Sequence, residues 1–163
     1  MWELLSMPGN QNGARSAVKS EPKGMRRPPT LLLLSDDEAL AALVRGIVAR
    51  PWVLVHHKSE GYLRHDGLPQ QNVRLVILDD QAVEETDRGW ILAQIRKRLS
   101  GTPLLYVAAS QSDANERRAR TNGAHYYISK PVSVDQFRHV LKSFLQAQRT
   151  DRQLRPAAVA PPE

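Results

Sequence analysis

The chain of 163 residues contains no cysteine, which removes two classes of structure at once. Without thiols it forms neither disulfide bonds nor thiolate-ligated metal centres. It also lacks any apolar run close to the roughly 20 residues of a membrane-spanning helix. Its N-terminus has no positively charged start followed by an apolar segment, so no secretory signal is expected. These absences predict a cytoplasmic protein with no membrane partner.

Two motifs of phosphate chemistry are also missing. No glycine-rich loop of the GxxxxGK(S/T) type occurs, which excludes a P-loop nucleotide hydrolase. The acidic pair Asp79 and Asp80 is followed by Gln81, so the DxD nucleophile motif of phosphatases is absent. The five histidines do not stand at the spacing of metal ligands on one helix, and we expect them to pack or to face solvent.

The net charge of +6 lies mainly at the two ends of the chain. Residues 1–29 hold five basic and two acidic residues with little periodicity. We therefore expect a disordered basic leader over 1–29, one folded domain over 30–147 and a disordered Pro- and Ala-rich tail over 148–163. Basic tails usually solvate a chain end, so nucleic acid is not an expected partner. Weak contact of these tails with acidic partners is the alternative.

Between the tails, the apolar pattern predicts short strands that alternate with amphipathic helices. The strands are expected at 30–34, 52–56, 73–79, 104–109 and 126–128. The helices are expected at 38–50, 59–65, 89–99, 112–122 and 133–147. Ser133 and Gln136 have the spacing of a capping box at the start of the last helix.

Five strand–helix repeats predict an α/β fold with a doubly wound parallel sheet. Because crossover connections are right-handed, the common solution for five strands is the order 2-1-3-4-5 with helices on both faces. In such sheets, ligands bind at the edge formed by the carboxyl ends of the strands.

Charged residues gather where three of the predicted strands end. Asp36 and Asp37 follow the first strand, Asp79 and Asp80 end the third, and Lys130 follows the fifth. The Asp79–Asp80 pair by itself also fits an ordinary turn. Carboxylates at one edge repel one another unless a cation joins them, and oxygen-rich sites suit Mg²⁺. A lysine beside them supplies charge for a phosphoryl oxygen, so phosphoryl transfer onto a carboxylate is the chemistry predicted.

These segments together resemble the response-regulator receiver domain of two-component signalling, over residues 30–146. The resemblance is carried by LLLLSDDE at 31–38, LVILDD at 75–80, TPLLYVAAS at 102–110 and GAHYYISKP at 123–131. It implies a flavodoxin-like fold with the phosphorylation site at the carboxyl edge of the sheet.

The resemblance also implies roles for individual residues. Asp79 matches the phosphoacceptor, with Asp80 as the competing assignment, and Lys130 matches the lysine that pairs with the phosphoryl group. Tyr127 matches the aromatic residue that moves on phosphorylation, or is a plain strand aromatic. The implied Mg²⁺ ligands are the side chains of Asp36, Asp37 and Asp79 and the backbone carbonyl of Gln81.

Three positions depart from the family pattern. Ala108 stands where receivers usually carry a threonine or serine whose hydroxyl bonds the phosphoryl group, and Ser110 lies too far along to replace it without a loop shift. Val83 stands where a proline is usual. Gly89 comes later than usual, so the acidic loop at 84–87 is longer. These departures affect the readout of phosphorylation more than phosphoryl acceptance.

The sequence therefore predicts a single-domain response regulator. A histidine kinase or a histidine phosphotransfer protein would supply the phosphoryl group to Asp79, with Mg²⁺ as cofactor, and output would pass by contact with a downstream protein. No enzyme activity is expected beyond its own phosphorylation and dephosphorylation. The alternative is a degenerate receiver that binds partners without phosphorylation, which Ala108, Val83 and the loop at 84–87 favour.

Overall fold

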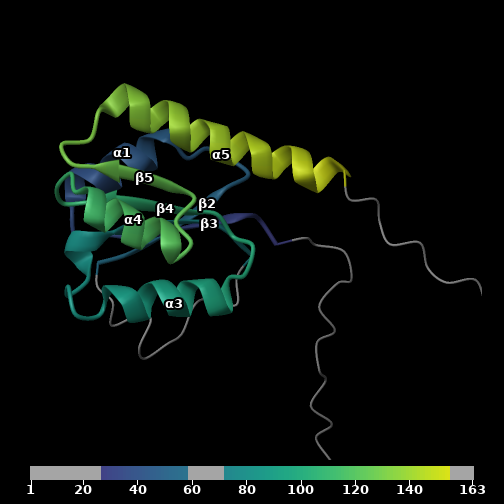
Figure 1. The fold of residues 1–163 in the computed structure, drawn as a ribbon. Helices are drawn as coiled ribbons and strands as arrows, with labels where there is room; N and C mark the ends of the chain where they lie inside the picture. The colour runs from purple at the N-terminus through teal and green to yellow at the C-terminus, as the bar shows by residue number, and fades with distance from the viewer. Residues whose placement is uncertain (1–26, 59–71, 155–163) are drawn as a thin grey trace, which may run out of the picture.

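The computed structural model describes residues 27–58 and 72–154 (Figure 1). The helix predicted at 59–65 lies outside these residues, as do most of the predicted leader (1–26) and the end of the predicted tail (155–163). Within the described residues, no helix is both long enough and apolar enough to cross a membrane.

Five parallel strands form one sheet in the order β2-β1-β3-β4-β5, which confirms the predicted topology. The strands are β1 (Thr30–Leu34), β2 (Val53–His57), β3 (Val73–Asp79), β4 (Leu104–Ala108) and β5 (Tyr126–Ser129). The helices of the described ranges are α1 (Glu38–Ile47), α3 (Arg88–Arg98), α4 (Asp113–Thr121) and α5 (Val134–Leu154), with a short 3-10 helix η1 (Asp80–Ala82).

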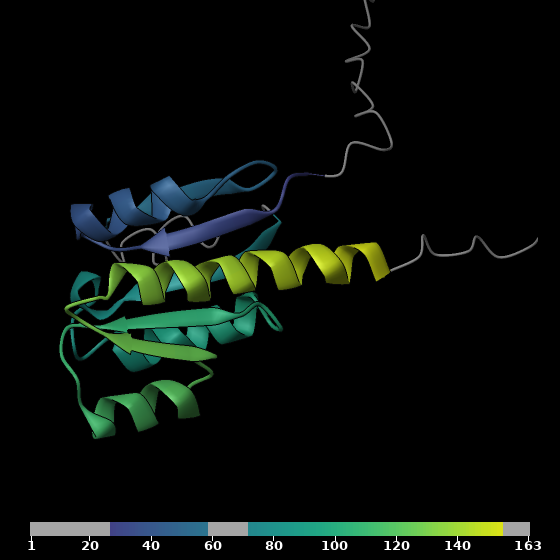
Figure 2. The ribbon, with the colours of Figure 1, turned by 90° about the horizontal axis from the view of Figure 1, so that it is seen from above.

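Helices cover both faces of the sheet, with α1 and α5 on one side and α3 on the other (Figure 1, Figure 2). Alternate side chains of β1 point to opposite faces of the sheet. Leu31 and Leu33 pack with α1 and α5, whereas Leu32 and Leu34 pack on the α3 side. Burial on both faces explains why Leu31 to Leu34 in β1 and Leu75 to Leu78 in β3 are continuous apolar runs. Each fully buried leucine stabilises the fold by about 1.5–3 kcal/mol, and this packing fixes where the strands end.

Helix α1 ends at Ile47, three residues before the predicted end at Arg50. Pro51 explains the difference: it has no N–H to donate to the Ile47 carbonyl, and its ring would clash there in a continuing helix. Proline also disfavours helical geometry at the residue before it. The C-cap Val48, three residues before Pro51, is extended, with φ −72° and ψ 118°.

Helix α5 runs to Leu154, seven residues beyond the end of the helix predicted at 133–147. The sequence loses its apolar stripe there, but it contains neither glycine nor proline before Pro156. A helix already nucleated by packing propagates through such residues at little cost. Figure 2 shows this end of α5 extending past the sheet.

The start of α5 keeps only half of the predicted capping box. Ser133 Oγ accepts a hydrogen bond from the Gln136 backbone N–H at 3.5 Å. The Gln136 side chain instead donates to the Tyr126 hydroxyl at 3.3 Å, which ties α5 to β5.

Candidate functional site

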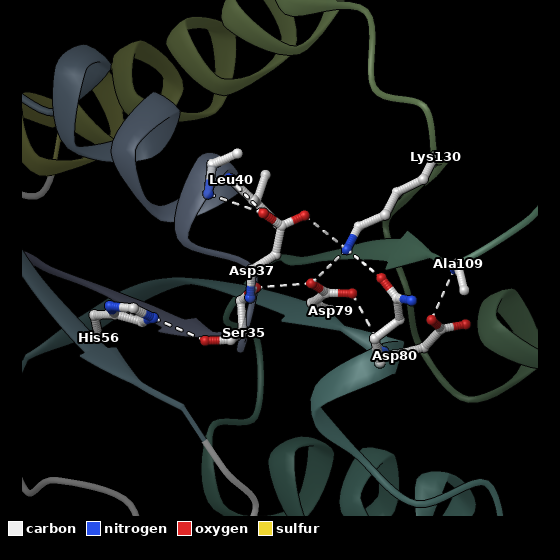
Figure 3. A network of polar contacts seen from close by, with 10 residues as sticks. Ser35, Asp37, Leu40, His56, Asp79, Asp80, Ala109 and Lys130 are labelled. Carbon is white, nitrogen blue, oxygen red and sulfur yellow. Dashed lines mark hydrogen bonds and ion pairs between the residues drawn. The ribbon is translucent and has the colours of Figure 1, made fainter.

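Polar side chains meet where β1, β3 and β5 end (Figure 3). The Lys130 ammonium lies at their centre. Its Nζ is 2.9 Å from Asp79 Oδ2, 3.0 Å from Asp37 Oδ2 and 2.6 Å from Gln81 Oε1. The two contacts with carboxylates are charge-assisted hydrogen bonds, which are stronger than neutral ones. The structure thus brings together Asp37, Asp79, Gln81 and Lys130 from the predicted site.

Asp79 is the last residue of β3, and its side chain is fully buried. A buried carboxylate is costly unless donors surround it. Ser35 Oγ donates to Asp79 Oδ2 at 2.7 Å, and the Gln81 backbone N–H donates to Oδ1 at 3.2 Å. The second bond caps η1, an element outside the strands and helices predicted from the sequence. Together with Lys130, these donors engage both carboxylate oxygens.

Ser35 is a buried site residue that the sequence analysis missed. Its carbonyl oxygen accepts from His56 Nε2 at 2.8 Å, which requires the ring proton on Nε2. The sheet register pairs Leu34 with Leu78, so the next residues, Ser35 and Asp79, are neighbours. The register places Ser35 there, because equal steps beyond a paired position stay adjacent in parallel strands, and the sequence alone does not give that register.

Asp37 serves the helix and the site at once. Its Oδ1 accepts from the backbone N–H groups of Ala39 and Leu40 and so caps α1, while its Oδ2 contacts Lys130. The Leu40 N–H, followed by Lys130, lowers the pKa of the Asp37 carboxyl. Burial acts to lower the pKa of Lys130, but the hydrogen bonds to Asp79 and Asp37 outweigh it and leave that pKa raised. Both Asp37 and Lys130 are therefore charged at neutral pH.

Asp36 stands apart from this cluster. Its side chain is exposed, and no hydrogen bond or ion pair joins it to Asp79 in the described part of the chain. Because Ser35 takes the place beside Asp79, the acidic pair begins two residues beyond the end of β1.

A Mg²⁺ site was predicted from Asp36, Asp37, Asp79 and the Gln81 carbonyl. Carboxylate oxygens suit this ion chemically. Across residues 27–58 and 72–154, however, no three side chains of His, Cys, Asp or Glu converge as metal ligands. Lys130 contacts both Asp37 and Asp79 and compensates their charge. The described side chains thus bring two carboxylates, those of Asp37 and Asp79, to this point and leave Asp36 apart. Proteins commonly hold Mg²⁺ through one or two carboxylates together with water and phosphate oxygens, so Asp37 and Asp79 are the side chains that would hold it.

Asp80 turns away from Lys130 and toward the end of β4 (Figure 3). Only 2% of it is exposed. Its Oδ1 accepts from the Ala109 backbone N–H at 2.8 Å, and its Oδ2 lies 3.8 Å from Arg88 Nη1. Burial raises the pKa of Asp80, and the Ala109 N–H and Arg88 oppose that rise. The adjacent carboxylates thus have different partners, and Asp79 is the one hydrogen-bonded to Lys130.

The end of β4 has no side-chain hydroxyl near the site. Ala108 is fully buried, and its carbonyl oxygen accepts from the Lys130 N–H at 2.8 Å. Ser110 is exposed, and its carbonyl oxygen accepts from the Tyr127 hydroxyl at 3.4 Å. The Tyr127 ring stacks on Tyr106, with centroids 5.8 Å apart and planes inclined by 8°. Tyr127 therefore packs against β4 and also binds the loop that follows it.

The two other departures from the family pattern lie around α3 and outside the Lys130 cluster. Val83 is buried in the core on the α3 side, where it packs with residues such as Ile91. Gly89 lies in the first turn of α3, where an added side chain would meet open space.

The sequence matches no family model. It is 30% identical over 125 residues to the probable methanogenesis regulatory protein FilR2 of Methanothrix harundinacea, covering 71% of this chain and 80% of that protein. It is 26% identical over 121 residues to the polar-differentiation response regulator DivK of Brucella anthropi, covering 72% of this chain and 97% of that protein. A crystal structure of a CheY-like response regulator receiver domain protein from Methanospirillum hungatei is similar with a TM-score of 0.62 at 19% identity, covering 76% of this chain and 98% of that one. The similarity extends over most of the length of each of these proteins.

Proposed function

Because the chain belongs to the response-regulator receiver family, we propose that it accepts a phosphoryl group on Asp79 from a histidine kinase or a histidine phosphotransfer protein. In this reaction the P–N bond of a phosphohistidine breaks, and a P–O bond forms to a carboxylate oxygen of Asp79. The imidazole leaves with the electron pair of the broken bond and takes up a proton, so no oxidant or reductant is needed.

The contact between Asp79 and Lys130 is the observation that carries this role. Phosphoryl transfer adds negative charge at a buried position, where an ammonium group 2.9 Å from the carboxylate interacts more strongly than it would in bulk water. The same ammonium also contacts Asp37 and Gln81. A small movement of Lys130 toward a phosphoryl oxygen therefore leaves it within this cluster.

Asp79 is preferred to Asp80 as the acceptor because of their partners. Asp80 bonds the Ala109 N–H and faces Arg88 across 3.8 Å, with no hydrogen bond to Lys130. Asp79 is bound to Lys130 and lies at the edge where the carboxyl ends of β1, β3 and β5 meet. In parallel sheets this edge is where ligands bind.

Incubation with acetyl phosphate, followed by mass spectrometry of the intact protein, tests the proposal. We expect the wild-type protein and the Asp80→Asn variant to gain one phosphoryl group, and the Asp79→Asn variant to gain none. Absence of a gain in the wild type, or an equal gain in the Asp79→Asn variant, would contradict the assignment. The reaction is run with and without Mg²⁺, since the family resemblance implies this ion and Asp37 and Asp79 bring two carboxylates together for it.

A second candidate function is a receiver that binds a partner protein without phosphorylation. Buried Ala108 favours it, because this position offers no hydroxyl to a phosphoryl group. In that case the Asp79→Asn variant keeps its partner in pull-down from the native cell and keeps its function there. Loss of both properties in this variant alone would exclude the second candidate.

The phosphorelay role makes the chain a signalling domain and not an enzyme acting on external substrates. Its output then passes through contact with a downstream protein, in the cytoplasm where the phosphodonor kinases present their phosphohistidines. Neither nucleic acid nor a membrane has a part in this scheme.

A further inference from the structure

A receiver with Ala108 at the end of β4 needs another group to link Asp79 with the loop beyond that strand. Asp80 is positioned for this task. It directly follows Asp79, and its buried carboxylate crosses from the end of β3 to the end of β4, where it accepts the Ala109 N–H at 2.8 Å. The adjacent strands pair Asp79 with Val107, so this bond joins the two strands just beyond their last pair.

The loop held by Asp80 is also the loop that contacts Tyr127. Ser110 follows Ala109 directly, and its carbonyl oxygen accepts from the Tyr127 hydroxyl at 3.4 Å. The Tyr127 ring stacks on Tyr106 of β4. A displacement of Ala109 therefore moves the hydrogen-bond acceptor of Tyr127, although neither Ala108 nor Ala109 has a polar side chain.

The charges around Asp80 make this bond sensitive to the state of Asp79. Asp79 and Asp80 are neighbours in the chain, and Asp80 is nearly excluded from water, so solvent screens their repulsion poorly. Arg88, 3.8 Å from Asp80, and Lys130, bound to Asp79, offset part of the repulsion. A phosphoryl group carries a charge of about −1.5 to −2 at neutral pH, more than the single charge of a carboxylate.

We propose that Asp80 is the positioning residue that couples Asp79 to the loop at 109–112 and to Tyr127, in place of a hydroxyl at position 108. Asp80 holds the loop through the Ala109 N–H while Asp79 is unmodified. Added negative charge on Asp79 weakens that bond and releases Ser110 and Tyr127. This role rests on Asp79 being the phosphoacceptor.

Two variants of the full chain separate the hydrogen bond from the charge. The Asp80→Ala variant removes the acceptor of the Ala109 N–H, and we expect this amide to exchange with solvent roughly tenfold faster. The Asp80→Asn variant keeps an oxygen acceptor of similar size but carries no charge. We expect its Ala109 amide to stay protected. The Glu84→Gln variant, which changes an exposed carboxylate of the acidic loop, is the control and should behave as the wild type.

The response to phosphorylation is then followed by NMR in the presence of acetyl phosphate, with the mass of each sample measured in parallel. In the wild type, labelling of Asp79 should shift the amide signals of Ala109 and Ser110 and the ring signals of Tyr127. In the Asp80→Asn variant the mass gain should persist while these shifts fall to less than about half, because the charge repulsion is gone. Equal shifts in both proteins at equal labelling would overturn the coupling role.

A third experiment tests the role of Asp80 without phosphorylation. It applies even if Asp79 takes up no phosphoryl group, a result that would refute the proposed function but not the coupling. The Asp79→Asn variant removes one negative charge beside Asp80 without any phosphodonor, so exchange of the Ala109 amide should slow. Unchanged exchange in both the Asp79→Asn and Asp80→Ala variants would show that Asp80 does not position this loop.

Discussion

Lys130 binds the two carboxylates of the site from different segments of the chain, Asp37 after β1 and Asp79 at the end of β3. Its positive charge thus stands where a divalent cation would also be attracted. We predict that the Lys130→Met variant binds Mg²⁺ at least about tenfold more tightly than the wild type, because two carboxylates are left without compensation. Calorimetric titration with MgCl₂ measures the difference. The Lys142→Met variant, on the exposed side of α5, is the control, and equal affinities in all three proteins would contradict the prediction.

Ser35 donates one of the hydrogen bonds that make the burial of Asp79 tolerable. The Ser35→Ala variant should lose about 1–2 kcal/mol of unfolding free energy, since the carboxylate loses a donor that water cannot easily replace. Urea denaturation measures this loss. The Ser100→Ala variant, which changes an exposed serine after α3, should stay within about 0.5 kcal/mol of the wild type. A loss of the same size in both would show that the Asp79 bond is not the cause.

For single residues, the sheet topology predicted the grouping of Asp37, Asp79 and Lys130, because residues that follow parallel strands share one edge of the sheet. Gln81 was implied only by the family resemblance, through its backbone carbonyl, whereas its side chain is the group that contacts Lys130. The sequence did not predict that Ser35 lies beside Asp79. Asp36 and Asp37, the two acids expected there, lie further along the chain. That outcome depends on the register of β1 against β3, which a one-residue shift would change and which composition does not encode. The turn of Asp80 toward Ala109 likewise depends on η1, a local hydrogen-bonded turn with no distinctive sequence pattern.

Among the elements, α1 is linked to the site by its own cap. Asp37 bonds the first N–H groups of the helix and also Lys130, and these donors lower its pKa from an ordinary value of 3.8. A lowered pKa in the folded state means that the charge of Asp37 stabilises the fold above the unfolded-state pKa. This stabilisation is lost as the pH falls through the folded-state pKa.

The Asp37→Asn variant isolates that charge, because asparagine caps helices about as well as aspartate. We expect the unfolding free energy of the wild type to fall more steeply than that of the variant as the pH drops below about 4. Urea denaturation over a series of pH values compares the two slopes. The neighbouring Asp36→Asn substitution, at an exposed position outside the cluster, should leave the wild-type slope unchanged.

The ends of the elements were the least predictable part of the fold. The apolar stripe of α5 shows where the helix packs, and Phe137 and Leu141 of this stripe are fully buried. It carries no information about where the helix stops beyond the stripe, so the seven residues up to Leu154 were missed. For α1 the opposite error arose, because Pro51 acts on the helix several residues before its own position.

For the molecule as a whole, one sheet shared by two cores should unfold as a single unit. Ile91 is fully buried on the α3 side and Phe137 on the α5 side. We predict that Ile91→Ala costs about 2–5 kcal/mol and Phe137→Ala about 3–5 kcal/mol. In each variant, circular dichroism and tryptophan fluorescence should report the same urea midpoint.

The Val134→Ala variant, at a position 47% exposed on α5, serves as the control and should stay within about 0.5 kcal/mol of the wild type. Separate midpoints for the two probes in either core variant would show that the two sides of the sheet unfold independently.

The topology itself was predictable because few arrangements satisfy the physical constraints. Continuous apolar runs such as Leu31 to Leu34 require cover on both faces, and right-handed crossovers leave few orders for five parallel strands. These two constraints together predict the strand order β2-β1-β3-β4-β5 that the structure has.

Asp79 and Asp80 are separated by one peptide bond, yet the first is bound to Lys130 after β5 and the second to Ala109 after β4. Successive side chains point in different directions here, so Asp79 and Asp80 contact different sets of partners. Natural selection can therefore act on each set through a different codon. A lineage that loses one of the two acids retains the contacts of the other, and its descendants can diverge in chemistry or in conformational response without first abandoning the fold.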